Sequence, residues 1–321
     1  MAPQGALCLI EESPRVAPAL MFHHFCGAHH PRGQGAITAD ELARLIEWIG
    51  PPNILPAGDW LRGFRRGSLL PSQICLTFDD NLKCQYDIAL PVLEHYGLTG
   101  FWFVYTCYST EKLLPRLEVY RHFRTVQFSD VEAFYEEFFG LSAQLYGDEV
   151  TIWLEQFDRS RFPMYPSFYS LNDCRFRQSR DSLLGQERYF GIMDQMLAKY
   201  GFDAGDIAQA VLMSDAEISD LHRRGHVLGL HSHTHPTDLS KLPEDRQVWE
   251  YERNFASLQA IIGEKPTTMS HPCNSYDASI LRLLGRLGIE LGFRADVAHT
   301  AYSRLEVPRR DHSGVMREVL Q

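Results

Sequence analysis

Two adjacent carboxylates, Asp79 and Asp80, close a short apolar segment of the chain. About 150 residues later a second apolar run ends in three alternating histidines, His231, His233 and His235. One carboxylate and two imidazoles can bind a divalent metal from one side and leave positions open for water and substrate. The remaining carboxylate then stays free to act as a base. The residue types and their spacing are therefore typical of a metal-dependent hydrolase.

Both motifs stand where a buried strand is expected to end. The runs Ile74–Leu76 and Val227–Leu230 are apolar throughout, as in strands covered on both faces. In α/β folds the carboxyl ends of parallel strands meet at one edge, and active sites lie there. We therefore expect Asp79, Asp80 and the histidines to meet at one rim. The alternative is a chance pair of polar clusters on the surface.

The rest of the chain alternates strands and helices, except over residues 107–212. That stretch has apolar residues at helical spacing and a capping box at Ser129–Glu132, so it predicts a helical insertion between residues 1–106 and 213–321 of one α/β domain. The other predicted elements are a strand over 17–25, a helix after the capping box Thr38–Glu41, a strand over 73–78, a helix over 84–96, a strand over 100–105, a helix capped at Ser214–Glu217 and a strand over 226–231.

At these residues the sequence resembles a known family, the polysaccharide deacetylases of the NodB-homology type (carbohydrate esterase family four). The segment Thr77–Asp80 matches the family's Thr-Phe-Asp-Asp-Gly motif, with Asn81 in the place of the glycine. The segment His231–His235 matches its His-Ser/Thr-x-x-His motif. The resemblance covers residues 70 to 106 and 211 to 295. It implies a distorted (β/α) barrel that hydrolyses an N-acyl group on a sugar with the help of a metal.

The resemblance also implies a role for each motif residue. Asp80, His231 and His235 would bind a divalent metal, for which we expect Zn²⁺, and Asp79 would be the general base. Asn81 would lie against the substrate. Its family counterpart is a glycine, which suggests a positive φ, and asparagine tolerates that conformation better than most residues.

Two of the family's later motifs are degraded. The third appears as Ser270–Tyr276 without its arginine, which leaves open how Asp79 is held. Pro272 and Cys273 of this segment are expected to bind substrate, with a backbone N–H near Cys273 stabilising the oxyanion. The closing Leu-x-x-His motif, which supplies an acid in many members, is replaced by Val307–His312.

The missing acid has four candidates. Ala19–Phe25 resembles the first strand of the exopolysaccharide-deacetylase subgroup, in which an early histidine lies in the pocket. The resemblance indicates His23 as the general acid. His24 is expected to bind substrate, or to act as the acid in place of His23. His271 and His312 are further alternatives. A histidine that merely caps hydrogen bonds at the strand end is the other interpretation of His23.

The middle of the insertion, Phe162 to Phe190, is rich in aromatics, including Tyr165 and Phe168, and contains Arg177. It could form a lid or a substrate-recognition subdomain, in which Arg177 binds a carboxylate or phosphate of the substrate. A small satellite core with a solvated basic loop is the alternative.

Composition limits the partners and the compartment. The net charge of −10 over 321 residues argues against nucleic acid and anionic membranes as partners. No apolar stretch is long enough to span a membrane, and the N-terminus shows no secretory signal. Seven scattered cysteines without a Cys-x-x-Cys pair suit reduced thiols. We expect a cytoplasmic enzyme and no integral membrane segment; the oligomeric state is left open.

Together these observations predict a metal-dependent N-deacylase that removes an acetyl or formyl group from an amino sugar. The expected substrate is a nucleotide- or lipid-linked precursor in bacterial cell-surface polysaccharide or lipopolysaccharide biosynthesis, such as that of O-antigen. A catalytically inactive sugar-binding relative is one alternative. The other is an unrelated metallohydrolase in which His231 and His233 form a His-x-His metal pair.

Overall fold

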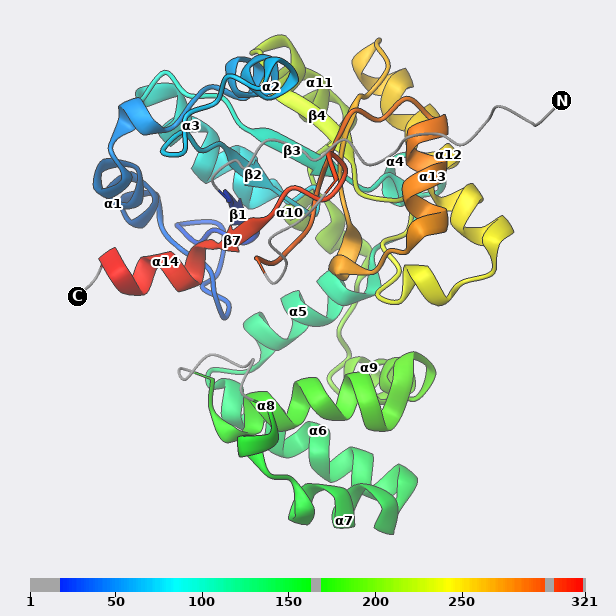
Figure 1. Ribbon diagram of the computed structural model, residues 1–321. Coiled ribbons are helices and arrows are strands. Elements are labelled where there is room, and N and C mark those ends of the chain that lie inside the picture. The colour runs from blue at the N-terminus through cyan, green and yellow to red at the C-terminus, as the bar shows by residue number, and fades with distance from the viewer. Residues whose placement is uncertain (1–17, 163–168, 298–302, 320–321) are drawn as a thin grey trace, which may run out of the picture. The chain divides into compact units, whose positions relative to one another are not determined.

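The computed structural model describes residues 18–162, 169–297 and 303–319 and divides the chain into two units (Figure 1). The first unit comprises residues 1–115 and 209–321, and the second comprises residues 116–208. The second unit begins later than the predicted residue 107 because helix α4 (Cys107–Glu111) packs on the first unit's helix α12 (Glu244–Ile262). Within the described ranges, every helix is too short or too polar to cross a membrane.

Seven strands of the described residues form one parallel sheet in the first unit, in the order β6-β5-β4-β3-β2-β1-β7. Their residues are almost all buried, which fits the continuous apolar runs of the sequence. The strands are β1 (Ala19–Phe22), β2 (Leu76–Phe78), β3 (Phe101–Val104), β4 (Val227–Leu230), β5 (Thr268–Ser270), β6 (Leu291–Phe293) and β7 (Arg309–Asp311).

The two ends of the sheet are joined by the segment that leads into β7. Phe293 forms a parallel bridge with Val307, whose N–H donates to the carbonyl of Gly292 at 2.8 Å. The approach is so close that a Cβ on Gly292 would lie 2.4 Å from the carbonyl oxygen of Leu305, so only glycine fits there. The sheet therefore closes, and the expected distorted (β/α) barrel is confirmed.

Helices surround this barrel (Figure 1). Alternate residues of β3 pack on opposite sides of the sheet: Trp102 lies in the core shared with the outer helices, whereas Phe101 and Phe103 pack against Phe293. The first unit's remaining helices are α1 (Ala39–Ile49), α2 (Ala57–Arg66), α3 (Leu90–His95), α11 (Asp215–Arg223), α13 (Ala278–Arg286) and α14 (His312–Val319), and α10 (Ala208–Val211) spans the second boundary.

The helix starts follow the sequence, with one correction. The capping boxes at Thr38 and Ser214 are both formed, and they open α1 and α11. The predicted box at Ser129 is wrong, because Asp130 is the N-cap of the next helix and accepts from the N–H of Glu132. The Glu132 carboxylate instead accepts hydrogen bonds from Ser170 and Asn172, and this tertiary contact could not be read from local spacing.

The second unit is helical and has its own core. Phe134, Phe138, Phe176 and Tyr189 are buried and in mutual ring contact. Two of the aromatics noted in the insertion, Phe176 and Tyr189, therefore form a satellite core, while Tyr165 and Phe168 lie outside the described residues. The helices are α5 (Arg116–Gln127), α6 (Val131–Tyr146), α7 (Asp148–Gln156), α8 (Leu171–Gln178) and α9 (Gly185–Lys199).

Candidate metal and catalytic site

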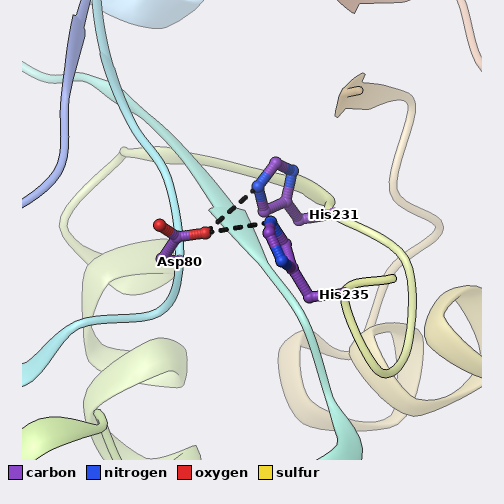
Figure 2. A group of neighbouring side chains, drawn as sticks. All are labelled: Asp80, His231 and His235. Atoms are coloured by element: carbon purple, nitrogen blue, oxygen red, sulfur yellow. Dashed lines mark ion pairs between the residues drawn. The ribbon is translucent and has the colours of Figure 1, made fainter. Parts of the chain in front are cut away.

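The chemistry-bearing side chains gather at the carboxyl ends of the barrel strands, as expected. Asp79 and Asp80 follow the last residue of β2, and His231 follows the last residue of β4. The loop after β4 turns back and brings His235 beside His231, with ring centroids 4.9 Å apart. Figure 2 shows both imidazoles facing the carboxylate of Asp80.

Strained backbone is concentrated in the loops of this rim. Among the described residues, seven that are not glycine have a positive φ, and six of them follow β2, β4 or β5. Such conformations persist only where the surroundings enforce them, and they cluster at functional sites. Asn81 has a φ of 55°, which agrees with its place in a glycine position of the motif. The six residues are Asp80, Asn81, Ser232, His235, Cys273 and Asn274.

Asp80, His231 and His235 have the spacing of a metal-binding group. Oδ1 of Asp80 lies 3.3 Å from Nε2 of His231 and 3.3 Å from Nε2 of His235. Two ligands of a tetrahedral zinc ion, each at about 2.0–2.1 Å from the metal, are about 3.3 Å apart. The three side chains therefore fit the ion that the sequence motif implies.

The hydrogen bonds of His231 orient its ring for the same purpose. Its Nδ1 lies 2.9 Å from the carbonyl oxygen of Ser270, which can only accept, so Nδ1 carries the proton. In the neutral ring, Nε2 then presents a lone pair to Oδ1 of Asp80. That oxygen is buried, and no donor in the described part of the chain satisfies it. Two such atoms that face each other at 3.3 Å need either a proton on Nε2 or a metal cation between them.

The electrostatics keep the Asp80 carboxylate charged. Burial alone would raise the pKa of Asp80, but the imidazoles of His231, His235 and His23 outweigh burial and hold it far below its usual value. Burial would likewise lower the pKa of His231, yet the carboxylates of Asp79 and Asp80 raise it overall. Asp80 is thus an anionic ligand over the ordinary pH range.

His233 does not share this site. Its Nδ1 is 2.9 Å from Oγ1 of Thr106, and its Nε2 is 2.6 Å from a carboxylate oxygen of Glu111. Both ring nitrogens are therefore engaged elsewhere. The group of described residues that could hold a metal contains His235 in its place. The His-x-His alternative is not supported.

The second carboxylate, Asp79, is fixed by an arginine that the sequence reasoning missed. Arg309 of β7 donates from both terminal nitrogens to the two oxygens of Asp79, at 2.7 Å each. Its remaining N–H groups donate to Thr77, Ser270 and the carbonyl of Arg294, so all five are used. Ser270 in turn donates to Asp79 at 3.2 Å. The arginine absent from the third motif is replaced by one that lies far along the chain.

This contact sets the charge of Asp79. Burial alone would raise the pKa of Asp79, but the charges of Arg309 and His231 lower it below its usual value. Oδ2 of Asp79 lies 4.0 Å from Nε2 of His231, so the carboxylate stands beside the metal-binding group without belonging to it. An ionised, oriented carboxylate in this place is suited to accept a proton.

Two neighbouring arginines allow a matched test. Arg309→Lys keeps the charge but loses the two-pronged bond to Asp79, and we expect a loss of about 1.5–3 kcal/mol in the free energy of unfolding of the metal-free protein. Arg310→Lys is the control, because Arg310 is 44% exposed and pairs only at the surface with Glu318, so its loss should stay below about 1 kcal/mol. Urea denaturation measures both. Equal losses in the two variants would show that the buried contact adds no stability.

Among the candidate acids, His23 lies beside the metal-binding group. Its Nε2 lies 3.8 Å from Oδ2 of Asp80, and its side chain is 30% exposed. His271 and His312 are buried. Nε2 of His271 contacts the carbonyl of Leu305, and the two ring nitrogens of His312 contact the carbonyls of Met21 in β1 and of Gly35. They are structural residues, which corrects their candidacy.

The remaining substrate-binding predictions are not tested by the contacts. Pro272 is buried and Cys273 exposed in the turn that follows β5, on the same rim as the metal-binding group. His24 accepts a hydrogen bond from the N–H of Ile37 through its carbonyl. Arg177 belongs to the helical unit, where its guanidinium lies 4.3 Å from the ring centroid of Tyr169. All four stay predictions as substrate contacts.

Comparison with known proteins bears on the family of this chain. A family model described as polysaccharide deacetylase matches residues 193–292, a range that includes His231 and His235. This confirms the family resemblance that the motifs predict. A search of curated proteins by sequence found no match.

Solved structures with the same fold are similar over nearly the whole chain. The deacetylase PplD of Streptococcus pyogenes, in complex with acetate, aligns with 93% of this chain and 92% of its own, at 14% identity and a TM-score of 0.53. IcaB from Ammonifex degensii aligns with 97% and 99%, at 15% identity and a TM-score of 0.50. A de-N-acetylase from Aggregatibacter actinomycetemcomitans aligns with 92% and 93%, at 13% identity and a TM-score of 0.50. At these identities the likeness concerns the fold.

Proposed function

The chain carries a polysaccharide deacetylase region, and we propose that it is a metal-dependent hydrolase that removes an N-acetyl or N-formyl group from an amino sugar. The observation that supports this most directly is the pairing of two differently used carboxylates. Asp80 faces two imidazole nitrogens at 3.3 Å, while Asp79 is held by Arg309 beside them. One carboxylate is thereby available to a metal and the other to a proton.

Zn²⁺ is the ion that we propose for Asp80, His231 and His235, because a carboxylate and two neutral imidazoles are a usual catalytic zinc set. An ion held there supplies Lewis-acid polarisation of the acyl carbonyl and makes water more acidic. The residues themselves provide the anionic ligand, the fixed tautomer of His231 and an open side toward His23.

Asp79 takes the proton from the attacking water in this proposal. Arg309 and Ser270 hold both carboxylate oxygens in place, so the base loses little freedom when it acts. The lowered pKa of Asp79 keeps it in the ionised form, which is the form that can take a proton, although it also makes the carboxylate a weaker base. The tetrahedral oxyanion would be stabilised by the ion and by a backbone N–H near Cys273.

The amine that leaves must then be protonated. His23 follows β1, and its Nε2 lies 3.8 Å from Oδ2 of Asp80, whereas His231 and His235 face Oδ1 of the same carboxylate. A partly exposed imidazole in this place can deliver a proton to the leaving group. We therefore assign the acid to His23.

The inactive sugar-binding alternative loses its main support. It rested on two degraded motifs, one of which lacks its arginine. Arg309 supplies that guanidinium from β7. His23 offers an imidazole in place of the histidine that the absent closing motif would supply. The geometry thus favours an enzyme over an inactive relative.

The substrate follows from the compartment expected from the sequence. Six cysteines of the described residues are free thiols, which fits a reducing environment. In a cytoplasm the amino sugar would be a nucleotide- or lipid-linked precursor of a cell-surface polysaccharide, of the kind used for O-antigen or lipopolysaccharide.

This proposal is tested by the release of acetate or formate. Protein loaded with one zinc ion per chain is incubated with free, nucleotide-linked and lipid-linked N-acetyl and N-formyl amino sugars, and the freed acid is quantified. We expect turnover on at least one linked sugar and its loss on chelation. Metal bound at one ion per chain without release from any substrate of the panel would favour the sugar-binding alternative.

A further inference from the structure

Helix α12 carries a row of buried polar side chains on the face it turns toward the barrel. Gln247, Glu250 and Asn254 are three and four residues apart, so they lie on one side of the helix, and each is at most 5% exposed. Burying a carboxylate and two amides is costly unless their hydrogen bonds are met. The partners of this row therefore show what it is used for.

Glu250 binds the backbone between the two metal-ligand histidines. One of its oxygens accepts from the N–H of His233 at 2.9 Å and from the N–H of Thr234 at 2.8 Å. The other accepts from the hydroxyl of Thr234 at 2.6 Å. A fully buried carboxylate thus takes three donors from two consecutive residues of this loop. These three hydrogen bonds are all directed at the segment that separates His231 from His235.

Asn254, one turn further along, binds the first ligand itself. Its Oδ1 accepts from the N–H of His231 at 3.0 Å. Its Nδ2 donates to the carbonyl of Val104 at 2.9 Å and to Oγ1 of Thr106 at 3.1 Å. The amide therefore connects the start of the histidine loop to the end of the neighbouring strand β3. This fixes where His231 leaves the sheet.

The loop is held from its other side by the residues that follow β3. The N–H groups of Thr106 and Cys107 both donate to the carbonyl of His233, at 3.2 and 3.0 Å. Residues 231–234 are thereby fixed between α12 and the end of β3. The backbone of Ser232 and His235 is in the left-handed region, which such a framework must enforce. None of these bonds involves a metal.

We infer that Glu250 and Asn254 are positioning residues that hold the histidine loop in its metal-binding conformation before a metal arrives. The inference rests on the metal site proposed above. A site that is formed in advance does not spend binding energy on ordering the loop, so the affinity for the ion depends on α12. His233 serves this framework as well, through its backbone and its ring.

Three variants of α12 test the inference by zinc affinity, measured by competition with a chromogenic chelator. Glu250→Ala should raise the zinc dissociation constant about 10–100-fold. Glu250→Gln should stay within about threefold of wild type, because its carbonyl can accept both N–H groups and its amide can donate to Thr234. Glu252→Ala is the matched control on the exposed side of the same helix and should leave the affinity unchanged.

Unfolding of the metal-free variants separates positioning from mere stability. If Glu250 only stabilised the fold, its substitution would lower the melting temperature and leave the zinc affinity of the folded protein unchanged. Folded Glu250→Ala protein with wild-type zinc affinity would overturn the inference. Loss of affinity in Glu250→Ala together with recovery in Glu250→Gln supports it.

Hydrogen exchange tests the inference independently on the wild-type chain. This test remains available if Glu250→Ala fails to fold. In metal-free protein the amides of His231, His233 and Thr234 should exchange about 100-fold or more slowly than in an unstructured chain, since Asn254 and Glu250 accept them without metal. Rapid exchange there, with slow exchange only after zinc is added, would show that the ion orders the loop. A wild-type chain that binds no zinc but protects these amides would count against the metal site and not against the role of α12.

Discussion

Asp79→Asn is expected to retain its metal ion and to lose about 10²–10⁴-fold in turnover, which is the usual contribution of a general base. The substitution keeps the size of the side chain but removes its ability to accept a proton at neutral pH. It leaves Asp80, His231 and His235 untouched, so the metal-binding group remains complete. Metal content by mass spectrometry and turnover on the active sugar are measured on the same preparation.

Asp80→Asn should show the reverse order of effects. Its Oδ1 is the atom that faces both imidazoles, and an amide oxygen carries no full charge for a divalent ion. We expect the zinc content to fall first and activity to fall with it, with partial recovery at high zinc concentration. Asp79→Asn should not recover in this way.

A control is needed because Asp79 also neutralises Arg309. Removing its charge leaves a buried guanidinium without its counterion, which lowers stability. Circular dichroism of both variants, with the exposed His95→Ala as a neutral reference, shows whether each protein is folded at the assay temperature. Equal loss of metal in folded Asp79→Asn and Asp80→Asn would mean that the two carboxylates do not have separate roles.

The part of the site that the sequence predicted depends on strand ends. The runs before Asp79 and His231 are apolar except for Thr77, which is the pattern of a strand covered on both faces. Because parallel strands end at one rim, two motifs about 150 residues apart could be placed together without a structure. The choice of His231 and His235, rather than His233, as the metal-binding pair could be made only from the family resemblance.

Arg309 could not be found in this way. Its bond to Asp79 joins residues 230 positions apart, and the segment around it has no feature of the family's third motif. Only the pairing of β7 with β1 brings this guanidinium to Asp79. In the structure Arg309 is buried and Arg310 is exposed, but two adjacent arginines in the sequence do not show which of them is buried. A buried arginine in a short strand is a signal that calls for a carboxylate partner.

The same reason explains the missed partners of α12. From the sequence, Glu250 and Asn254 are ordinary polar residues of a helix, and their burial follows from the packing of α12 on β4. Their targets are backbone N–H groups, which every residue offers. Local spacing therefore carries no sign of them, and only the fold does.

His23→Gln is expected to lower turnover on N-acyl sugars by about 10²–10⁴-fold, since an amine leaves poorly from a tetrahedral intermediate unless it is protonated. Glutamine has a similar size but no acidic proton near neutral pH. Nε2 of His23 lies 3.8 Å from Asp80, so the zinc content must be measured in the variant and should stay near one ion per chain. Loss of metal with loss of activity would assign His23 to the metal-binding group instead.

The leaving group separates an acid from every other role of His23. An aryl acetate expels a phenolate, which departs without a proton, so His23→Gln should hydrolyse it within about threefold of the wild-type rate, while the amide rate falls by orders of magnitude. If His23 instead bound substrate or positioned the metal, its substitution would slow both reactions alike. His24→Gln is the matched control, because consecutive residues of an extended chain point to opposite sides. It should affect the two substrates equally. If His24→Gln gives the selective loss on amides and His23→Gln does not, the acid is His24, and the closeness of His23 to Asp80 serves only the charge of that carboxylate.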